Sequence, residues 1–191
     1  ISGICYKTIG KLDEAVKRFK KALAIKPDYA EVHYNLGVTL QELGQLNAAV
    51  KSYEKALAIK PDYAIACNNL GFTLQELGQL DMALKSYEKA LAIKPDYADA
   101  HNNLGISLNK LGQLDEAFKC YERAIDIKPD FTEAHNNLGN VLKALGQFDA
   151  AIKSYEKVLA IKPDFAEAHN NLGIALMDLG QLDAAVKHYE Q

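Results

Sequence analysis

The chain has 191 residues, of which 49% are hydrophobic and 25% are charged, a composition typical of soluble globular proteins. Its 22 lysines and arginines stand against 25 acids, and the net charge of −3 argues against a nucleic-acid-binding surface. No apolar run approaches the roughly 18 residues that a membrane span needs, and no charged-then-apolar leader follows Ile1.

Glycine and proline recur with a period of 34 residues, which predicts a repeat architecture. The twelve glycines form two series with this step, one beginning at Gly3 and the other at Gly10. No glycine or proline falls outside the pattern, so 1–191 is predicted to be a single solenoid domain. The prolines are Pro27, Pro61, Pro95, Pro129 and Pro163. Counted from the residue after each K-P-D-[YF] motif, the full repeats are 30–63, 64–97, 98–131 and 132–165, with partial repeats at 1–29 and 166–191.

Each repeat predicts two helices, and 98–131 shows the pattern. Asp96 is expected to cap the first helix, with Asp99 completing a capping box. Gly112 ends that helix in a left-handed conformation, Asp115 caps the second helix, and the proline ends the repeat. The same cap spacing recurs as Asp28/Glu31, Asp130/Glu133 and Asp164/Glu167, but Ile65 breaks it in the second full repeat. The predicted buried stripes are Ala100, Leu104, Leu108 and Leu111, followed by Ala117, Phe118, Tyr121, Ala124, Ile125 and Ile127.

Two helices of this length cannot bury a core alone, but stacked pairs can, so the predicted fold is an all-α solenoid of antiparallel helix pairs. Gly105 and its equivalents lie in the middle of the first helix, where glycine costs about 1 kcal/mol relative to alanine. We interpret this glycine as a point where two helices approach too closely for a side chain.

The 34-residue period and four sequence blocks resemble tetratricopeptide (TPR) repeats: N-L-G, E-A or A-A, Y-E-K-A and the K-P ending. The resemblance covers essentially the whole chain and implies a right-handed superhelix whose first helices line a concave groove. The chain departs from the family where a large residue such as Trp is usual, because it has His33, Cys67, His101, His135 and His169.

The sequence motifs A-H-N-N-L-G and I-K-P-D-F are similar to those in the TPR portion of O-GlcNAc transferase and of related bacterial multi-repeat proteins. That resemblance implies a ladder of asparagines that grips peptide backbone. We call the matching positions the second-Asn row: Asn35, Asn69, Asn103, Asn137 and Asn171. We call the preceding asparagines the first-Asn row: Asn68, Asn102, Asn136 and Asn170.

The residues themselves also favour this role. One Asn side chain offers an acceptor and two donors, so it can satisfy a peptide N–H and C=O whatever side chain the peptide carries. Packed helices lie about 8–10 Å apart and an extended chain advances about 3.3–3.6 Å per residue, so one Asn should meet every second or third ligand residue. The first-Asn row is rotated by about 100° and is expected at the groove edge. Alternatively, both rows only bridge neighbouring helices by hydrogen bonds.

Apolar residues accompany the second-Asn row and could contact ligand side chains: Val38, Phe72, Ile106 and Ile174. Asn140, the polar exception at this position, is also predicted to contact the peptide. Acids dominate the same stripe, and Lys110 is its single base, so neutral or basic peptides should be favoured. The arrays of Lys and Arg that clamp chaperone carboxylates are missing. The acids, which can instead serve as caps, are Glu31, Asp99, Glu133, Glu167, Glu42, Glu76 and Asp178.

No catalytic motif or cofactor-binding motif occurs, so we expect neither an enzyme nor a cofactor. Histidines in successive repeats should lie near 10 Å apart, too far to share a metal, so they are interpreted as packing residues. Cys5, Cys67 and Cys120 form no C-x-x-C pair and predict inert thiols in a reducing, cytoplasmic compartment.

The leading hypothesis is a scaffold that binds a protein or an extended peptide, with no nucleic acid and no membrane as partner. Three alternatives remain: a substrate-recruiting arm of a larger, glycosyltransferase-like enzyme, a self-assembling structural spacer, and an RNA-binding repeat, for which the groove lacks basic residues. The last repeat stops at Gln191, so bare apolar surface and end-to-end self-association are expected there.

Overall fold

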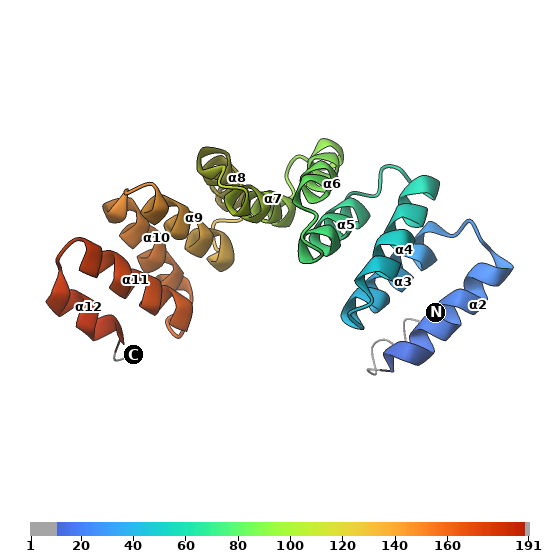
Figure 1. The fold of residues 1–191 in the computed structure, drawn as a ribbon, viewed down its shortest axis with the longest axis horizontal. Coiled ribbons are helices and arrows are strands. Elements are labelled where there is room, and N and C mark those ends of the chain that lie inside the picture. Colours follow the sequence, from blue (N-terminus) through green and yellow to red (C-terminus); the bar gives the residue numbers. More distant parts are fainter. Residues whose placement is uncertain (1–10, 190–191) are drawn as a thin grey trace. The chain divides into compact units, whose positions relative to one another are not determined.

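The computed structural model describes residues 11–189, with side chains described for residues 11–186. This part of the chain consists of α-helices joined by short turns and contains no strand (Figure 1). The helices are α2 (Leu12–Ile25), α3 (Ala30–Glu42), α4 (Leu46–Ile59), α5 (Ala64–Glu76), α6 (Leu80–Ile93), α7 (Ala98–Lys110), α8 (Leu114–Ile127), α9 (Thr132–Ala144), α10 (Phe148–Ile161), α11 (Ala166–Asp178) and α12 (Leu182–Tyr189). None of the described helices is long and apolar enough to cross a membrane.

The chain forms two compact units, one ending at Pro95 and the other beginning at Asp96. In the N-terminal unit, α3 packs against α4 and α5 against α6 as antiparallel pairs, while α2 packs on α3 and α4 on α5. The C-terminal unit repeats this order with the pairs α7/α8, α9/α10 and α11/α12. Each unit is therefore a stack of helix pairs, as the 34-residue period predicts.

The helix starts differ from the predicted caps. In α7 the N-cap residue is Tyr97, one position after Asp96, and α8 has Gln113 as its N-cap. No N-cap residue among α2 to α11 makes a side-chain hydrogen bond to its helix. Asp99 and Asp115 lie inside the first turn, where their negative charge stabilises the helix dipole. The capping-box interpretation is therefore wrong, because the turn places an aromatic residue at the cap position.

The short turns between paired helices depend on glycine. Gly112 has φ of +77°, in the left-handed region that other residues rarely adopt, as the sequence predicts. The neighbouring Leu111 was expected in the core, but α7 ends at Lys110 and Leu111 is 40% exposed. Ala100, Leu104 and Leu108 of the same predicted stripe are buried.

A glycine and a tyrosine make the closest contact within each helix pair. The four tyrosines Tyr53, Tyr87, Tyr121 and Tyr155 are at most 1% exposed. A Cβ atom placed on the facing glycine would lie 2.5–2.7 Å from the nearest ring carbon, closer than real contacts allow. The prediction that these mid-helix glycines permit close helix approach is confirmed for Gly37, Gly71, Gly105 and Gly139.

The K-P-D-[YF] turn between repeats is held by two side-chain contacts. The Nε2 atom of His135 lies 2.9 Å from the carbonyl oxygen of Pro129, and His33 and His169 make the same bond to the proline six residues before them. The Nζ atom of Lys128 lies 4.6 Å from the centre of the Phe131 ring, a cation–π contact. These histidines are buried, so the prediction that they pack within the repeat stack is confirmed.

Candidate functional site

Three members of the second-Asn row make hydrogen bonds to the preceding repeat of their own unit. In the C-terminal unit, Asn137 donates from Nδ2 to Oδ1 of Asn102 at 3.0 Å, and Asn171 donates to Asn136 at 3.2 Å. In the N-terminal unit, Asn69 donates to the hydroxyl of Tyr34 at 3.2 Å. The partner is always 35 residues earlier, at the first-Asn position of the preceding repeat.

The other two members of the row differ from this arrangement. Asn35 donates to the carbonyl of Glu31 in its own helix at 2.7 Å. Asn103 is half-buried in α7. All five members of the second-Asn row are partly accessible, and their contact with a ligand stays a prediction.

The first-Asn row lies deeper than expected for a groove edge. Asn68, Asn102 and Asn136 are only 6%, 6% and 3% exposed, while Asn170 is exposed. Asn136 accepts from Asn171 and donates to Oε1 of Glu167 at 2.9 Å, so it joins two neighbouring repeats. The first-Asn row therefore has a packing role, and direct contact of this row with a ligand stays a prediction.

Bridging does not exhaust the hydrogen-bonding capacity of Asn137 and Asn171, whereas Oδ1 of Asn69 already accepts a 3.3 Å hydrogen bond from Asn68. Asn137 and Asn171 each use one amide hydrogen for the bridge, and no donor among the described residues reaches their Oδ1 atoms. Each side chain therefore keeps one carbonyl acceptor and one N–H donor. This combination matches the donor and acceptor of one peptide unit, and the bridge fixes the orientation of the amide that offers them.

The apolar members of the stripe differ in accessibility. Phe72 is 38% exposed, whereas Ile106 is half-buried. Asn140, also proposed as a contact, accepts a 2.8 Å hydrogen bond from the hydroxyl of Tyr155, so part of its polarity serves the helix pair. The acids predicted along the stripe are all exposed: Glu31, Asp99, Glu133, Glu167, Glu42, Glu76 and Asp178.

The structure also reveals a polar network that the sequence did not suggest. Gln41 accepts hydrogen bonds from the Tyr53 hydroxyl at 3.0 Å and from Thr73 at 3.1 Å, and it donates to Glu76 at 3.4 Å. Tyr53 lies on the second helix of its pair. Its side chain therefore extends past the facing glycine to the polar face of the first helices. The signal available in the sequence was the recurrence of Gln in L-Q-E-L-G, which accompanies Tyr twelve residues later in two repeats.

The thiols offer weak nucleophiles. Burial raises the pKa of Cys67, and burial followed by the nearby Glu116 raises the pKa of Cys120 to about 11. Both thiols are therefore protonated at neutral pH, which agrees with the inert role predicted for them. Cys5 lies outside the described residues. No group of three potential metal ligands occurs in the described part of the chain.

At the end of the C-terminal unit, α12 exposes apolar side chains. Leu182 is 62% exposed and Val186 is 53% exposed, although the equivalent Phe148 and Ile152 of the preceding repeat are half-buried. The expected bare apolar surface is present in the described residues, and self-association through it stays a prediction.

Comparison with known proteins agrees with this fold. Models of the TPR repeat and the tetratricopeptide repeat match residues 6–44, 28–96, 62–130, 120–153 and 139–180. Comparison with curated protein sequences gives no match. Among solved structures, MamA is 30% identical, with a TM-score of 0.80 and coverage of 86% of this chain and 96% of MamA.

Two further solved structures extend the comparison. PilW, described as a widely conserved type IV pilus biogenesis factor, is 26% identical with a TM-score of 0.86, and the match covers 97% of this chain and 86% of PilW. YrrB, described as a TPR protein with an unusual peptide-binding site, is 26% identical with a TM-score of 0.75, covering 90% of this chain and 89% of YrrB. The chain therefore belongs to the tetratricopeptide repeat family, whose repeats form scaffolds for protein–protein interaction.

Proposed function

We propose that this protein is a non-catalytic scaffold that binds extended peptide segments through hydrogen bonds from its second-Asn row to peptide backbone. The observation that carries the proposal is the pair of unused groups on Asn137 and Asn171, each with a carbonyl oxygen that no described donor reaches. The bridge to the preceding repeat holds each amide in place before ligand arrives, which lowers the entropy cost of binding.

The charge of the surrounding stripe defines the ligand further. Seven acids of the stripe are exposed and Lys110 is its only base, so the scaffold favours neutral or basic peptides. Phe72 offers an exposed apolar contact beside Asn69. The description of YrrB as a peptide-binding TPR protein supports the class of ligand.

The proposal predicts that binding depends on the peptide backbone more than on its side chains. An array of twelve-residue neutral and basic peptides would first identify a ligand. N-methylation of alternate residues on the contacting edge removes its N–H donors and should weaken binding at least about tenfold, because three hydrogen bonds of about 0.5–1.5 kcal/mol each are lost. Binding is measured by fluorescence anisotropy.

Methylation of the intervening residues is the control, because their N–H groups point away from the scaffold and the same number of methyl groups is added. It should change the affinity less than about threefold, as should alanine substitution of single side chains. Equal losses from both methylation patterns, or a dominant effect of one side chain, would contradict backbone recognition.

A further inference from the structure

A second candidate site lies on the opposite side of α3 from the second-Asn row. A cavity of about 630 Å³ opens between α2 and α4. Its floor on α3 includes His33, Leu36 and Leu40, which are rotated by roughly half a turn from Asn35 and Val38 on a helix of 3.6 residues per turn. The two faces can therefore be occupied and altered independently.

The cavity combines an apolar floor with a basic rim. Leu23 of α2 and Ala48 of α4 complete the floor. Three exposed lysines line it, Lys20 from α2 on one side and Lys51 and Lys55 from α4 on the other. Asp28 is the one acid of this lining.

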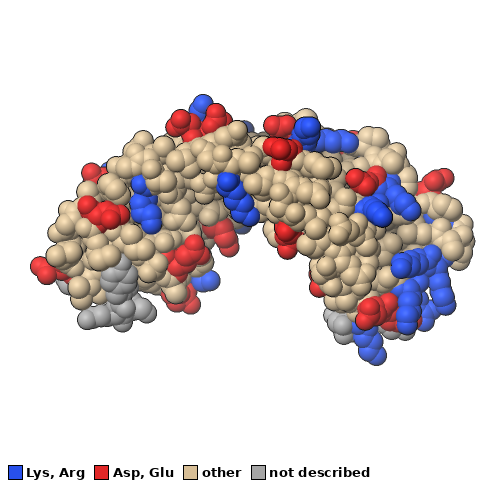
Figure 2. All heavy atoms as spheres, in the orientation of Figure 1, with Lys and Arg blue, Asp and Glu red and all other residues tan. Residues whose placement is uncertain are grey.

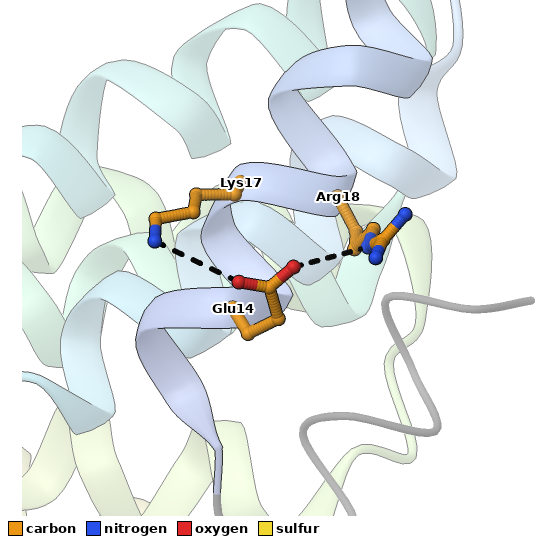
Figure 3. Close-up of polar contacts among 3 residues, drawn as sticks. All are labelled: Glu14, Lys17 and Arg18. Carbon is orange, nitrogen blue, oxygen red and sulfur yellow. Dashed lines mark hydrogen bonds and ion pairs between the residues drawn. The ribbon is translucent and has the colours of Figure 1, made fainter.

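The lysines of this rim are available to a ligand. On α2, Glu14 pairs with Lys17 at 3.7 Å and with Arg18 at 3.2 Å (Figure 3). Lys20 has no carboxylate within ion-pairing distance in the described part of the chain, and the same is true of Lys51 and Lys55. Lys and Arg side chains gather over α2, at the lower right in Figure 2.

The repeat provides an internal comparison for this cavity. The equivalent cavity of the C-terminal unit, between α8 and α10, measures about 300 Å³. Lys153 and Lys157 hold the places of Lys51 and Lys55, but Glu122 holds the place of Lys20. Glutamate occupies this position in every later repeat that contains it: Glu54, Glu88, Glu122, Glu156 and Glu190. The reversal of charge at Lys20 therefore makes the N-terminal cavity more basic than its equivalent in the C-terminal unit.

We propose that the cavity between α2 and α4 binds an acidic peptide segment that carries large apolar side chains. Apolar side chains would pack on the leucines of the floor, and flanking Asp or Glu side chains would face the lysines on both sides, as an amphipathic peptide does in a hydrophobic groove. Three separate positive charges fit several carboxylates on one ligand better than the single carboxylate of a fatty acid. The ligand differs in charge from the neutral or basic peptides proposed for the second-Asn row.

A peptide-display library of sixteen-residue random sequences, selected against the whole chain in low salt, tests the proposal. The selection should enrich peptides that combine Asp or Glu with Leu, Ile or Phe. The affinity of one such peptide should fall about tenfold in the variant K51E/K55E and several-fold in K20E, and it should weaken as salt screens the charges.

The variant K153E/K157E is the matched control, because it makes the same two substitutions at the same positions of the C-terminal cavity. It should alter the affinity less than about twofold. Equal loss in both double variants, enrichment of basic peptides only, or no enrichment over an unrelated protein would overturn the proposal. Loss of peptide binding in N69A/N137A/N171A would place the peptide on the second-Asn row instead of in the cavity. Binding of dodecanoate without binding of any acidic peptide would assign the cavity to lipid carboxylates. Failure of backbone recognition at the second-Asn row would leave this result unchanged.

Discussion

Raising the pH from 10 to 11 is expected to lower the free energy of unfolding by about 4 kcal/mol. Burial raises the pKa of four phenols, Tyr53, Tyr87, Tyr121 and Tyr155, above the ordinary value near 10. The folded state keeps these phenols protonated while the unfolded state releases their protons. These phenols therefore contribute their full stabilisation to the folded state below pH 10. That stabilisation is lost as the pH rises toward the folded pKa, by about 1 kcal/mol per tyrosine between pH 10 and pH 11.

Urea unfolding followed by circular dichroism at pH 8, 9, 10 and 11 measures this loss. Domains of this kind have an unfolding free energy of about 5–15 kcal/mol, so the expected loss should lower the urea concentration at the unfolding midpoint strongly. Replacement of all four tyrosines by phenylalanine should flatten the dependence above pH 10. A stability that stays level between pH 10 and pH 11 would show that these phenols are not shielded from solvent as the structure places them.

Gly139→Ala is expected to destabilise the chain by about 1–3 kcal/mol, even though alanine is the better helix former. Its Cβ atom would lie 2.5 Å from Cε1 of Tyr155, and the ring is 0% exposed, so the helix pair must separate or the ring must move. Denaturant unfolding of the variant measures the cost.

A double-mutant cycle separates this contact from backbone effects. Tyr155→Leu removes the ring, so the variants at Gly139 and Tyr155 should be coupled by at least about 1 kcal/mol. Gly146→Ala is the control, because Gly146 has φ of +74° with open space around it, and its cost is one of backbone conformation alone. Strict additivity of Gly139→Ala with Tyr155→Leu would contradict the close contact.

Most of the fold could be predicted because periodicity reports burial directly. The spacing of glycine and proline gives the repeat, and the alternation of apolar residues gives the buried face of each helix. The error at the helix starts has a local cause: Asp96 stands in a sequence typical of a cap, but the K-P-D-Y turn places Tyr97 at the cap instead. Propensity alone does not reveal how a proline turn sets the entry of the chain into a helix.

The candidate site was only partly predictable. The sequence identified the polarity and the register of both Asn rows, because recurrence at 34 residues is visible in the chain. The pairing of Asn137 with Asn102 could not be predicted from the sequence, because it depends on how far one helix is displaced along the next. The basic cavity depended on one departure from the repeat at Lys20, a signal that becomes meaningful only when the neighbouring helix brings Lys51 and Lys55 beside it.

The two Asn rows should differ in function although they are hydrogen-bonded to each other within each unit. The most direct measurement compares N69A/N137A/N171A with N68A/N102A/N136A, using peptide affinity well below the melting temperature and denaturant unfolding for both. Each variant breaks bridges between repeats, so both should lose stability by about 1 kcal/mol or more per substitution. The first-row variant thereby serves as the stability-matched control. The predicted result is a loss of peptide affinity of about tenfold or more in the second-row variant and a clearly smaller loss in the first-row variant, which removes the acceptors that orient Asn137 and Asn171 but leaves their own amides in place. Unchanged affinity in the second-row variant, or an equal loss in both, would show that the asparagines only hold the repeats together.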